Sequence, residues 1–302
     1  MKEIMEGIMS DGHHVHVVKY TSENPIAHVH ILHGLAEHIG RYEEFASFLV
    51  SHGFSVSGHD HRGHGRTAEK NGQFGYYGDG EGFDRVVEDV REVLHLVYKE
   101  ESLPLILLGH SMGSFVARRY MQKYSETLSK VILSGTMYSP GIMGDAGILL
   151  GKFQSKVHSP QTESPLLNSL AFGAFNKQVK NPETPFDWLT RDAEEVQKYI
   201  DDPLCGFIPT NKLYTDMFGG LKTIHKQQEI EKVRKDLPIL LISGEVDPVG
   251  KNGKDVFKVA EGMKKAGMRN ITVQLVEGAR HEILKETNRQ QTYEVMLNWM
   301  LK

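Results

Sequence analysis

The chain of 302 residues is long enough to bury a large core, and its 39% hydrophobic and 25% charged shares are those of a globular protein rather than a membrane-embedded one. A formal net charge of −4 gives no electrostatic reason to expect nucleic acid as a partner. The one cysteine, Cys205, excludes an intrachain disulfide, so a reducing compartment is the simplest expectation.

The first residues include the acids Glu3 and Glu6 where a secretory signal peptide would carry basic residues, and no long apolar segment follows them. No run approaches the roughly 18 consecutive apolar residues of a membrane-spanning helix. We therefore expect a cytoplasmic protein for which peripheral contact with membranes is still allowed.

Short apolar runs alternate with amphipathic spacing in the first part of the chain. Strands are expected at 14–20 and 26–32, joined as a hairpin by the turn-forming sequence Ser-Glu-Asn-Pro at 22–25. The other expected elements are helices at 41–52, 83–97 and 112–124 and strands at 54–58, 105–109 and 131–133. A strand, a helix and a strand in direct succession indicate a parallel sheet with helices on its faces, so the predicted fold class is α/β.

The pattern changes between residues 137 and 222, where prolines interrupt short apolar segments and no strand is evident. We interpret 137–222 as a helical cap inserted into the fold. Strand-like runs return at 238–244 and 271–276, each followed by a helical pattern. The predicted organisation is a core in two parts, 1–136 and 223–302, with the cap between them.

One stretch carries the strongest functional signal. An apolar run from Leu105 leads into Gly109-His-Ser-Met-Gly113, and a helical pattern follows at once. This G-x-S-x-G spacing is typical of a nucleophile elbow, a tight turn between a strand and a helix. A serine hydroxyl becomes a good nucleophile when it is held on such a turn beside a base and near backbone N–H donors. Ser111 is therefore the predicted nucleophile.

A serine nucleophile needs a base, and the base needs an acid that orients it. Asp247 follows the strand at 238–244, and His281 follows the strand at 271–276, so both are expected at carboxyl ends of strands, where open α/β sheets bind ligands. The chain order serine, aspartate, histidine is the one found after an elbow of this kind. Glu245 is a nearby alternative acid, but we favour Asp247 because Pro248 stiffens the loop after it.

The oxyanion that forms when Ser111 attacks an acyl carbonyl needs two N–H donors. One is expected from the backbone of Met112. The other is expected from the backbone of Leu35, in the loop that follows the strand ending at Leu32. The neighbouring His33 is interpreted as a structural brace for this loop.

Histidines elsewhere raise the question of a metal site. The loop Gly58-His-Asp-His-Arg-Gly-His-Gly65 contains residue types that can bind zinc or iron, so a metal-dependent hydrolase using the His59–His64 loop is an alternative of another class. The loop is short and no second ligand group appears at a supporting distance, so we expect no metal and no other cofactor. His28 and His30 alternate along a predicted strand and are interpreted as surface or partly satisfied sheet residues.

The motifs together resemble a known family. His33-Gly-Leu-Ala-Glu-His38, the elbow around Ser111 and Glu277-Gly-Ala-Arg-His281 are similar to the monoacylglycerol lipase and lysophospholipase branch of the α/β-hydrolases, which is related to serine aminopeptidases of the S33 type. The resemblance runs from about residue 14 to the carboxyl terminus and is strongest in the core. It implies that the polar end of a substrate pocket is formed by Glu37, Arg41, His110 and Tyr199.

The expected function is a serine carboxylester hydrolase that cleaves monoacylglycerol-like lipid esters through an acyl-enzyme on Ser111. Alternatives are a lysophospholipase, a short-chain carboxylesterase, an aminopeptidase of the proline-releasing type, and a non-catalytic member of the fold. The expected partner is a small lipid ester; peripheral membrane contact through the cap is allowed, and the oligomeric state is left open. An apolar channel for the acyl chain is expected under the cap from Ile148, Leu149, Leu150, Leu166, Leu167, Leu170, Phe172 and Phe175.

Overall fold

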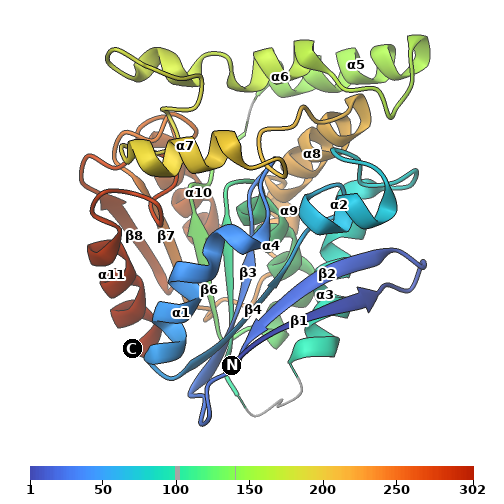
Figure 1. Cartoon of the computed structure of the whole chain (residues 1–302). Helices are drawn as coiled ribbons and strands as arrows, with labels where there is room; N and C mark the ends of the chain where they lie inside the picture. The colour runs from blue at the N-terminus through green and yellow to red at the C-terminus, as the bar shows by residue number, and fades with distance from the viewer. Residues whose placement is uncertain (99–102, 140) are drawn as a thin grey trace.

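A sheet of eight strands runs through the middle of the molecule, with helices on both of its faces (Figure 1). The computed structural model describes residues 1–98, 103–139 and 141–302. The strand order is β1-β2-β4-β3-β5-β6-β7-β8, and the pairs from β4 to β8 are parallel. The strands are β1 (Lys2–Ile8), β2 (His14–Tyr20), β3 (Ala27–Leu32), β4 (Phe54–His59), β5 (Leu105–His110), β6 (Lys130–Ser134), β7 (Ile239–Gly244) and β8 (Ile271–Val276).

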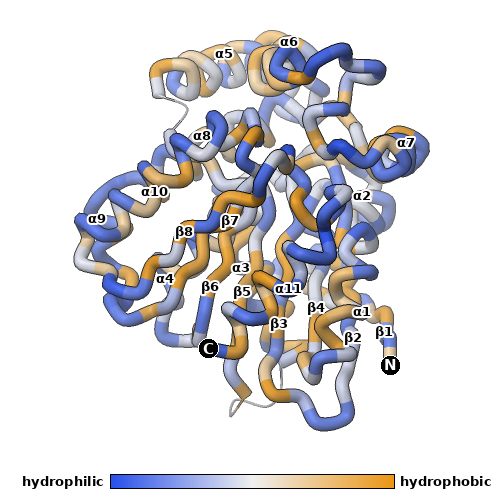
Figure 2. Tube along the Cα trace, turned by 90° about the vertical axis from the view of Figure 1, so that its left-hand side faces the viewer, coloured by the Kyte–Doolittle hydropathy of each residue, from blue (hydrophilic) through white to orange (hydrophobic). Residues whose placement is uncertain are grey.

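The central strands are apolar because both faces of the sheet are covered, and β3, β4, β5 and β7 are buried along their whole length. Helices α3, α4, α8 and α10 pack on one face, and α1 and α11 pack on the other. Figure 2 shows the strands as hydrophobic tubes between helices that turn polar sides outward. These helices are α1 (Glu43–Ser51), α3 (Gly82–Val97), α4 (Met112–Tyr124), α8 (Asn211–Ile224), α10 (Lys254–Lys265) and α11 (Arg289–Leu301). The α/β prediction is confirmed.

The predicted hairpin between the strands at 14–20 and 26–32 is wrong. Strand β2 pairs antiparallel with β1 and with β4, whereas β3 lies between β4 and β5. Strand β4 lies between β2 and β3, so these two consecutive strands do not touch as a hairpin pair would. The hairpin partner of β2 is the exposed edge strand β1. Charged residues interrupt the apolar pattern of β1, so the sequence pattern did not identify it as a strand.

Helices dominate the described part of 137–222. They are α5 (Ile142–Val157), α6 (Pro165–Phe172), α7 (Ala193–Asp201) and α8. Helix α5 lies directly on α8, because Gly147 and Gly151 let it approach Phe218 and Thr215. Figure 1 shows α5, α6 and α7 above the carboxyl ends of the strands. The lower face of α8 joins the core cluster, so the proposed boundary at 222 cuts through shared packing.

The short helix α2 (Gly65–Asn71) packs against β2, whereas α9 (Gln227–Ile230) packs against α8 and α10 at the outer edge of the molecule (Figure 2). Within the described ranges, no helix combines the length and apolarity needed to cross a bilayer.

Candidate active site

Ser111 occupies the sharp turn between β5 and α4. Its φ of +51° lies in the left-handed region that side chains avoid, and its N–H donates to the carbonyl of Ser134 at 2.9 Å. The flanking glycines are required by close backbone approach: a Cβ on Gly113 would lie 2.1 Å from the carbonyl oxygen of Leu32, and one on Gly109 would lie 2.3 Å from that of Gly113. The geometry is that of a nucleophile elbow.

His281 and Asp247 are in direct contact. Nδ1 of His281 lies 3.0 Å from each carboxylate oxygen of Asp247, which also accepts from the Ser243 hydroxyl at 3.0 Å and from the Val249 N–H at 2.9 Å. Because the carboxylate can only accept, Nδ1 carries the proton and Nε2 is left as a base. Burial alone would lower the pKa of His281, but the adjacent Asp247 outweighs it and raises that pKa above 6.5.

The same pairing keeps Asp247 ionised. Burial acts to raise the pKa of this carboxyl, but His281 and the hydrogen bonds it accepts lower it below 3.8. Glu245, the other candidate acid, is exposed and accepts from the N–H of Gly278 at 3.0 Å. The structure therefore brings Asp247 to His281 and directs Glu245 to a neighbouring turn.

Ser111 and His281 share one cavity of about 350 Å³, called the main cavity below. Leu35 lines it as well, from the loop after β3, and Met112 directly follows Ser111 as the first residue of α4. Among the described residues, no acceptor contacts the backbone N–H of either one. The main cavity is lined by Gly34, Leu35, Ala36, Glu37, His110, Ser111, Asn168, Ser169, Phe172, Gly173, Pro185, Phe186, Trp188, Leu189, Tyr199, Gly206, Phe207, Pro209, His281 and Glu282.

A buried ion cluster lies beside the serine. Arg41 donates to Glu37 at 2.7 Å and makes two parallel hydrogen bonds to Glu282, at 2.6 and 2.7 Å. Glu37 also accepts from the Gly34 N–H at 2.5 Å and from the Tyr42 hydroxyl at 2.8 Å. Burial opposes the charge of Glu37, but Arg41 and these donors lower its pKa below 4.5.

Tyr199 and His110 complete this end of the cavity. The guanidinium carbon of Arg41 lies 4.9 Å from the centre of the Tyr199 ring, whose hydroxyl donates to the carbonyl of Ala36 at 3.0 Å. The His110 ring lies 4.7 Å from that of His281. Burial and the neighbouring His281 lower the pKa of His110 to about 4, so His110 is neutral at pH 7. The four residues implied by the resemblance therefore lie together.

Sequence reasoning missed Glu282 as a member of this group. It contributes both oxygens to the Arg41 pair and lines the main cavity. The sequence did offer one indication of this role, because Glu282 directly follows the predicted base His281. A residue next to the base on the same loop can reach the same cavity.

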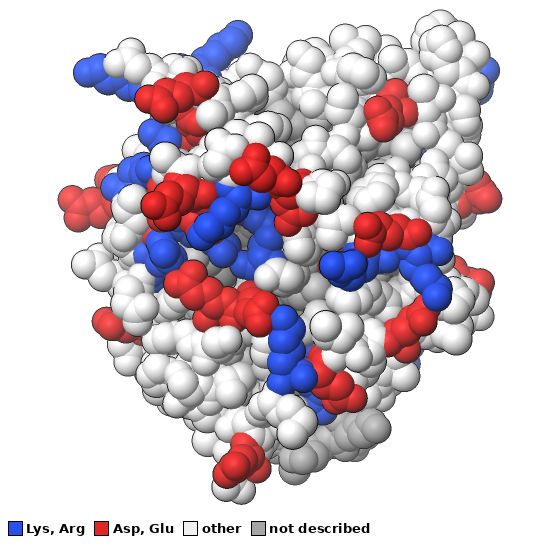
Figure 3. Space-filling model, in the orientation of Figure 1, with Lys and Arg blue, Asp and Glu red and all other residues white. Residues whose placement is uncertain are grey.

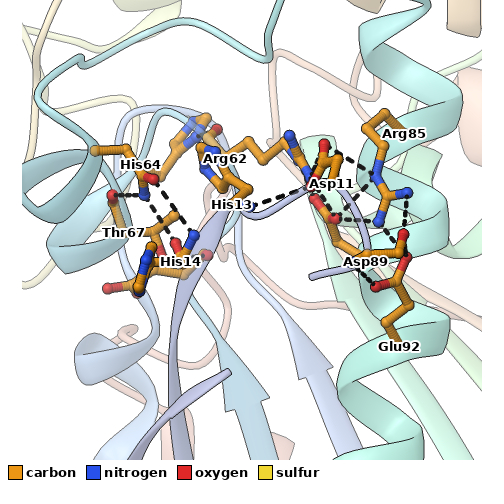
Figure 4. Close-up of polar contacts among 12 residues, drawn as sticks. Asp11, His13, His14, Arg62, His64, Thr67, Arg85, Asp89 and Glu92 are labelled. Carbon is orange, nitrogen blue, oxygen red and sulfur yellow. Dashed lines mark hydrogen bonds and ion pairs between the residues drawn. The ribbon is translucent and has the colours of Figure 1, made fainter. Parts of the chain in front are cut away.

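The loop from His59 to His64 has structural contacts. The two carboxylate oxygens of Asp60 each accept a backbone N–H at 2.8 Å, from Ile39 and from Arg66. Arg62 is bound by Asp89 and Asp11, as Figure 4 shows beside α3. These bonds hold the loop beneath the oxyanion segment.

The brace function predicted for His33 is confirmed by two contacts. Its Nδ1 lies 2.7 Å from the Gly34 carbonyl oxygen and its Nε2 accepts from the N–H of His61 at 2.9 Å. Among the described residues, the only side chains near enough to share a metal ion are His38, Asp202 and Cys205 rather than the His59–His64 group. In that trio, Nε2 of His38 lies 2.8 Å from a carboxylate oxygen of Asp202. Nδ1 of His38 accepts from the Gly40 N–H, so Nε2 carries the proton and donates it to Asp202 as an ordinary hydrogen bond.

The predicted channel residues are mostly placed elsewhere. Of the eight, Phe172 lines the main cavity, whereas Leu149, Leu166 and Leu170 are exposed on the outer side of α5 and α6. The apolar wall instead includes Phe186, Trp188 and Leu189 from the segment before α7, which the sequence did not single out. A helical period identifies an apolar face but does not say whether that face turns inward or outward.

Comparisons with known proteins agree with this geometry. A family model described as "Serine aminopeptidase, S33" matches residues 23–288. A monoglyceride lipase homolog from Monkeypox virus is 30% identical over 265 residues, covering 87% of this chain and 84% of the viral protein. The human monoglyceride lipase is 28% identical over 272 residues, covering 87% of this chain and 77% of the human one.

Among solved structures, a thermostable carboxyl esterase from Bacillus coagulans in complex with glycerol is 27% identical, with a TM-score of 0.92 over 99% of this chain and 98% of that one. The family match spans well over half of the chain, and the solved relative reproduces nearly all of its fold. The chain therefore belongs to the serine aminopeptidase S33 family and is a carboxylic ester hydrolase with the α/β-hydrolase fold.

Proposed function

We propose that this enzyme cleaves monoacylglycerol-like lipid esters through an acyl-enzyme on Ser111, with His281 as base and Asp247 as its orienting acid. The observation that carries the proposal is the strained Ser111 in one cavity with an Asp247-bound histidine. The named activities of the relatives, monoglyceride lipase and carboxyl esterase, support the substrate class.

The mechanism follows from these positions. Nε2 of His281 takes the proton of the Ser111 hydroxyl as its oxygen attacks the ester carbonyl. The developing oxyanion receives the N–H groups of Leu35 and Met112, and Asp247 stabilises the imidazolium. The imidazolium then protonates the leaving alcohol. Water hydrolyses the acyl-enzyme with the same base, which restores the serine.

The main cavity offers a different surface to each half of such a substrate. Glu37, Tyr199 and Glu282 give one end hydrogen-bonding groups, whereas Phe172 and Trp188 line another part with aromatic rings. We assign the alcohol of the substrate to the first end, near Arg41 and His110, and the acyl chain to the aromatic part. Residues 137–222 would then act as a cap over a core formed by 1–136 and 223–302.

Labelling with a fluorophosphonate probe followed by peptide mass spectrometry tests the proposed nucleophile. The expected adduct is on Ser111 and is absent from Ser111→Ala. Ser169→Ala, which removes another hydroxyl from the main cavity, should label like the wild type. A labelled Ser111→Ala protein, or activity that chelators abolish while Ser111→Ala stays active, would overturn the assignment in favour of a metal-dependent reaction.

A substrate panel tests the reaction class. Monoacylglycerol, lysophosphatidylcholine, p-nitrophenyl esters and aminoacyl amides are compared by kcat/KM under the same conditions. The proposal expects the monoacylglycerol to be cleaved best. Cleavage of the amide alone would identify an aminopeptidase, and preference for the phospholipid or for short esters would identify a lysophospholipase or a carboxylesterase.

Peripheral contact with a bilayer through α5 and α6 is a further part of the proposal, together with a cytoplasmic location. Ile142, Leu149 and Phe153 expose 87%, 70% and 64% of their surface, and Leu166 and Leu170 are also exposed. Figure 2 shows these helices with hydrophobic segments away from the sheet, and Figure 3 shows few charges over them. Such a patch suits lipid that must pass from a bilayer to the cavity beneath.

Co-sedimentation with phosphatidylcholine vesicles tests this contact. The double variant Leu149→Ser/Phe153→Ser should lose most vesicle binding while keeping its activity on a water-soluble ester. Lys152→Ser changes an exposed residue of the same helix and should bind as the wild type does. Equal binding of all three proteins would contradict docking through this patch.

A further inference from the structure

Two carboxylates, and no lysine or arginine, face the main cavity among the described residues that line it. They are Glu37 and Glu282, whose relative exposures are 3% and 6%. Arg41 stands behind them, because it lines the small neighbouring cavity of about 20 Å³ but not the main one. A substrate bound next to Ser111 therefore meets the acids before it meets their cation.

The charges of this cluster do not cancel. One guanidinium balances one carboxylate, so Arg41 with Glu37 and Glu282 keeps one negative charge. The next cation, Lys285, lines the small cavity but not the main one, and is bound to Glu195 at 3.1 Å. Glu195 also binds Lys198 at 2.5 Å, but the Lys198 side chain is 68% exposed, so solvent screens its charge. His110 is held neutral by burial, as its pKa near 4 shows. The polar end of the cavity is therefore negative in a setting where burial strengthens electrostatic interactions.

The free hydrogen-bonding capacity of these acids is that of acceptors. Each oxygen of Glu282 receives one N–H from Arg41, and a carboxylate oxygen can accept about two hydrogen bonds. The Oε2 atom of Glu37 also receives only Arg41, whereas its Oε1 atom is filled by Gly34 and Tyr42. Hydroxyl groups and protonated amines can donate to the remaining lone pairs, whereas a quaternary ammonium such as that of choline has no N–H and is attracted through its charge. A phosphate ionised at pH 7 cannot donate, and its charge is repelled.

We infer that Glu282, together with Glu37, makes the polar end of the main cavity select leaving alcohols that are neutral polyols or cations and reject those that carry a phosphate. This inference rests on the proposed ester hydrolysis and narrows its substrate class. Glu282 acts as a specificity-determining residue, since it neutralises the guanidinium that could otherwise attract an anionic head group.

The test compares three substrates with one acyl chain: a monoacylglycerol, an acylcholine and a monoacylglycerol phosphate. For the wild type, kcat/KM for the phosphate should be lower than for the other two by about 100-fold, the size expected for a few kcal/mol of like-charge repulsion. Glu282→Gln keeps the side-chain shape but makes the cluster neutral. In this variant the preference for the other two substrates over the phosphate should decrease by about tenfold or more. Glu245→Gln removes an exposed acid outside the cavity and should keep the wild-type ratio.

A second measurement needs no variant. Glycerol and choline should inhibit wild-type hydrolysis of a p-nitrophenyl ester at concentrations where glycerol 1-phosphate does not. Thermal unfolding checks that Glu282→Gln is folded. An unchanged ratio in folded Glu282→Gln, or inhibition by glycerol 1-phosphate equal to that by glycerol, would overturn the inference while leaving ester hydrolysis intact. Failure of the proposed function is separate: the wild type would then cleave none of the three esters.

Discussion

The floor and the roof of the main cavity are built in different ways. The floor consists of loops after the strands, and its groups are fixed by backbone contacts such as the bond from Ser111 to Ser134. The roof comes from 168–173 and 185–189 and carries the aromatic rings of Phe172, Phe186 and Trp188, of which Phe172 and Trp188 are in ring contact. Backbone geometry tolerates few alternatives, whereas aromatic packing tolerates many. The reaction is thus specified by the floor, and the acyl chain that fits can vary with the roof.

Removing one hydroxyl from each part gives the largest contrast. Ser111→Ala should lower kcat by about 10⁶-fold, since the nucleophile acts as a unit with its base. Ser169→Ala, from the roof, should leave kcat near the wild-type value. Hydrolysis of a water-soluble p-nitrophenyl ester measures both. Comparable losses in the two variants would show that the division between floor and roof does not describe the chemistry.

Asp247, the acid that orients the base in the floor, affects both the rate and its pH dependence. Asp247→Asn should lower kcat by about 10⁴-fold because His281 loses its orienting partner. The base must be neutral, and its pKa is raised above 6.5 chiefly because Asp247 overcomes the effect of burial. Wild-type kcat/KM should therefore rise with pH through a midpoint above 6.5, and the midpoint should fall in Asp247→Asn. A midpoint that stays in place would contradict the pairing as the cause.

A matched pair of glycine substitutions compares the elbow in the floor with an open position on α8 that does not line the main cavity. Gly113→Ala places a Cβ 2.1 Å from a backbone oxygen of Leu32, which cannot move aside, and should cost at least about 3 kcal/mol of unfolding free energy. Gly219→Ala in α8 meets nothing within 4 Å and should stabilise the protein by up to about 1 kcal/mol through helix propensity. Urea denaturation gives both values. Equal effects would mean that the elbow is less constrained than its geometry indicates.

Buried histidines make the region beneath the floor sensitive to acid. His28 and His30 were expected to be surface or partly satisfied sheet residues, but both are buried and share the Ser57 hydroxyl at 2.7 Å. Burial lowers the pKa of His28 to about 4, so it stays neutral in the fold while the unfolded chain protonates near 6.5. Its contribution to stability is present above pH 6.5 and is lost as the pH falls toward 4.

The expected loss at pH 5 is about 2 kcal/mol for this one group. Urea denaturation at pH 7.5 and pH 5 measures it: His28→Gln should lose about 2 kcal/mol less than the wild type between the two conditions. The exposed His95→Gln serves as the control and should match the wild type. A His28→Gln protein as acid-sensitive as the wild type would exclude His28 as a source of the effect.

The same division explains what the sequence could predict about the fold. The elements at 14–20, 112–124 and 271–276 match the structure residue for residue, because periodicity reports local structure directly. The hairpin between 14–20 and 26–32 failed because periodicity identifies strands but not their neighbours in a sheet. Pairing depends on which strand is buried on both faces, and that is settled only by the whole sheet.

The site shows the same contrast. The contact between Asp247 and His281 could be anticipated, since strand ends converge at one edge of a parallel sheet. Glu282 was missed because its partner Arg41 is 241 residues away, and no local pattern reports such a pair. The acyl-channel residues were mostly misplaced because the inward face of α5 and α6 is decided by how these helices dock.

The smallest expected effect tests the roof itself. Phe172 lines the main cavity and contacts the rings of Phe175 and Trp188, at 5.7 and 6.1 Å between centres. Phe172→Ala should lower kcat/KM for a long-chain p-nitrophenyl ester by about tenfold, because the acyl chain loses one apolar contact surface. The value of kcat/KM for p-nitrophenyl acetate should stay unchanged. Phe257→Ala, at an exposed site on α10, should change neither. Equal losses on both esters would mean that Phe172 supports the floor, and the roof would then share in the chemistry instead of selecting the chain.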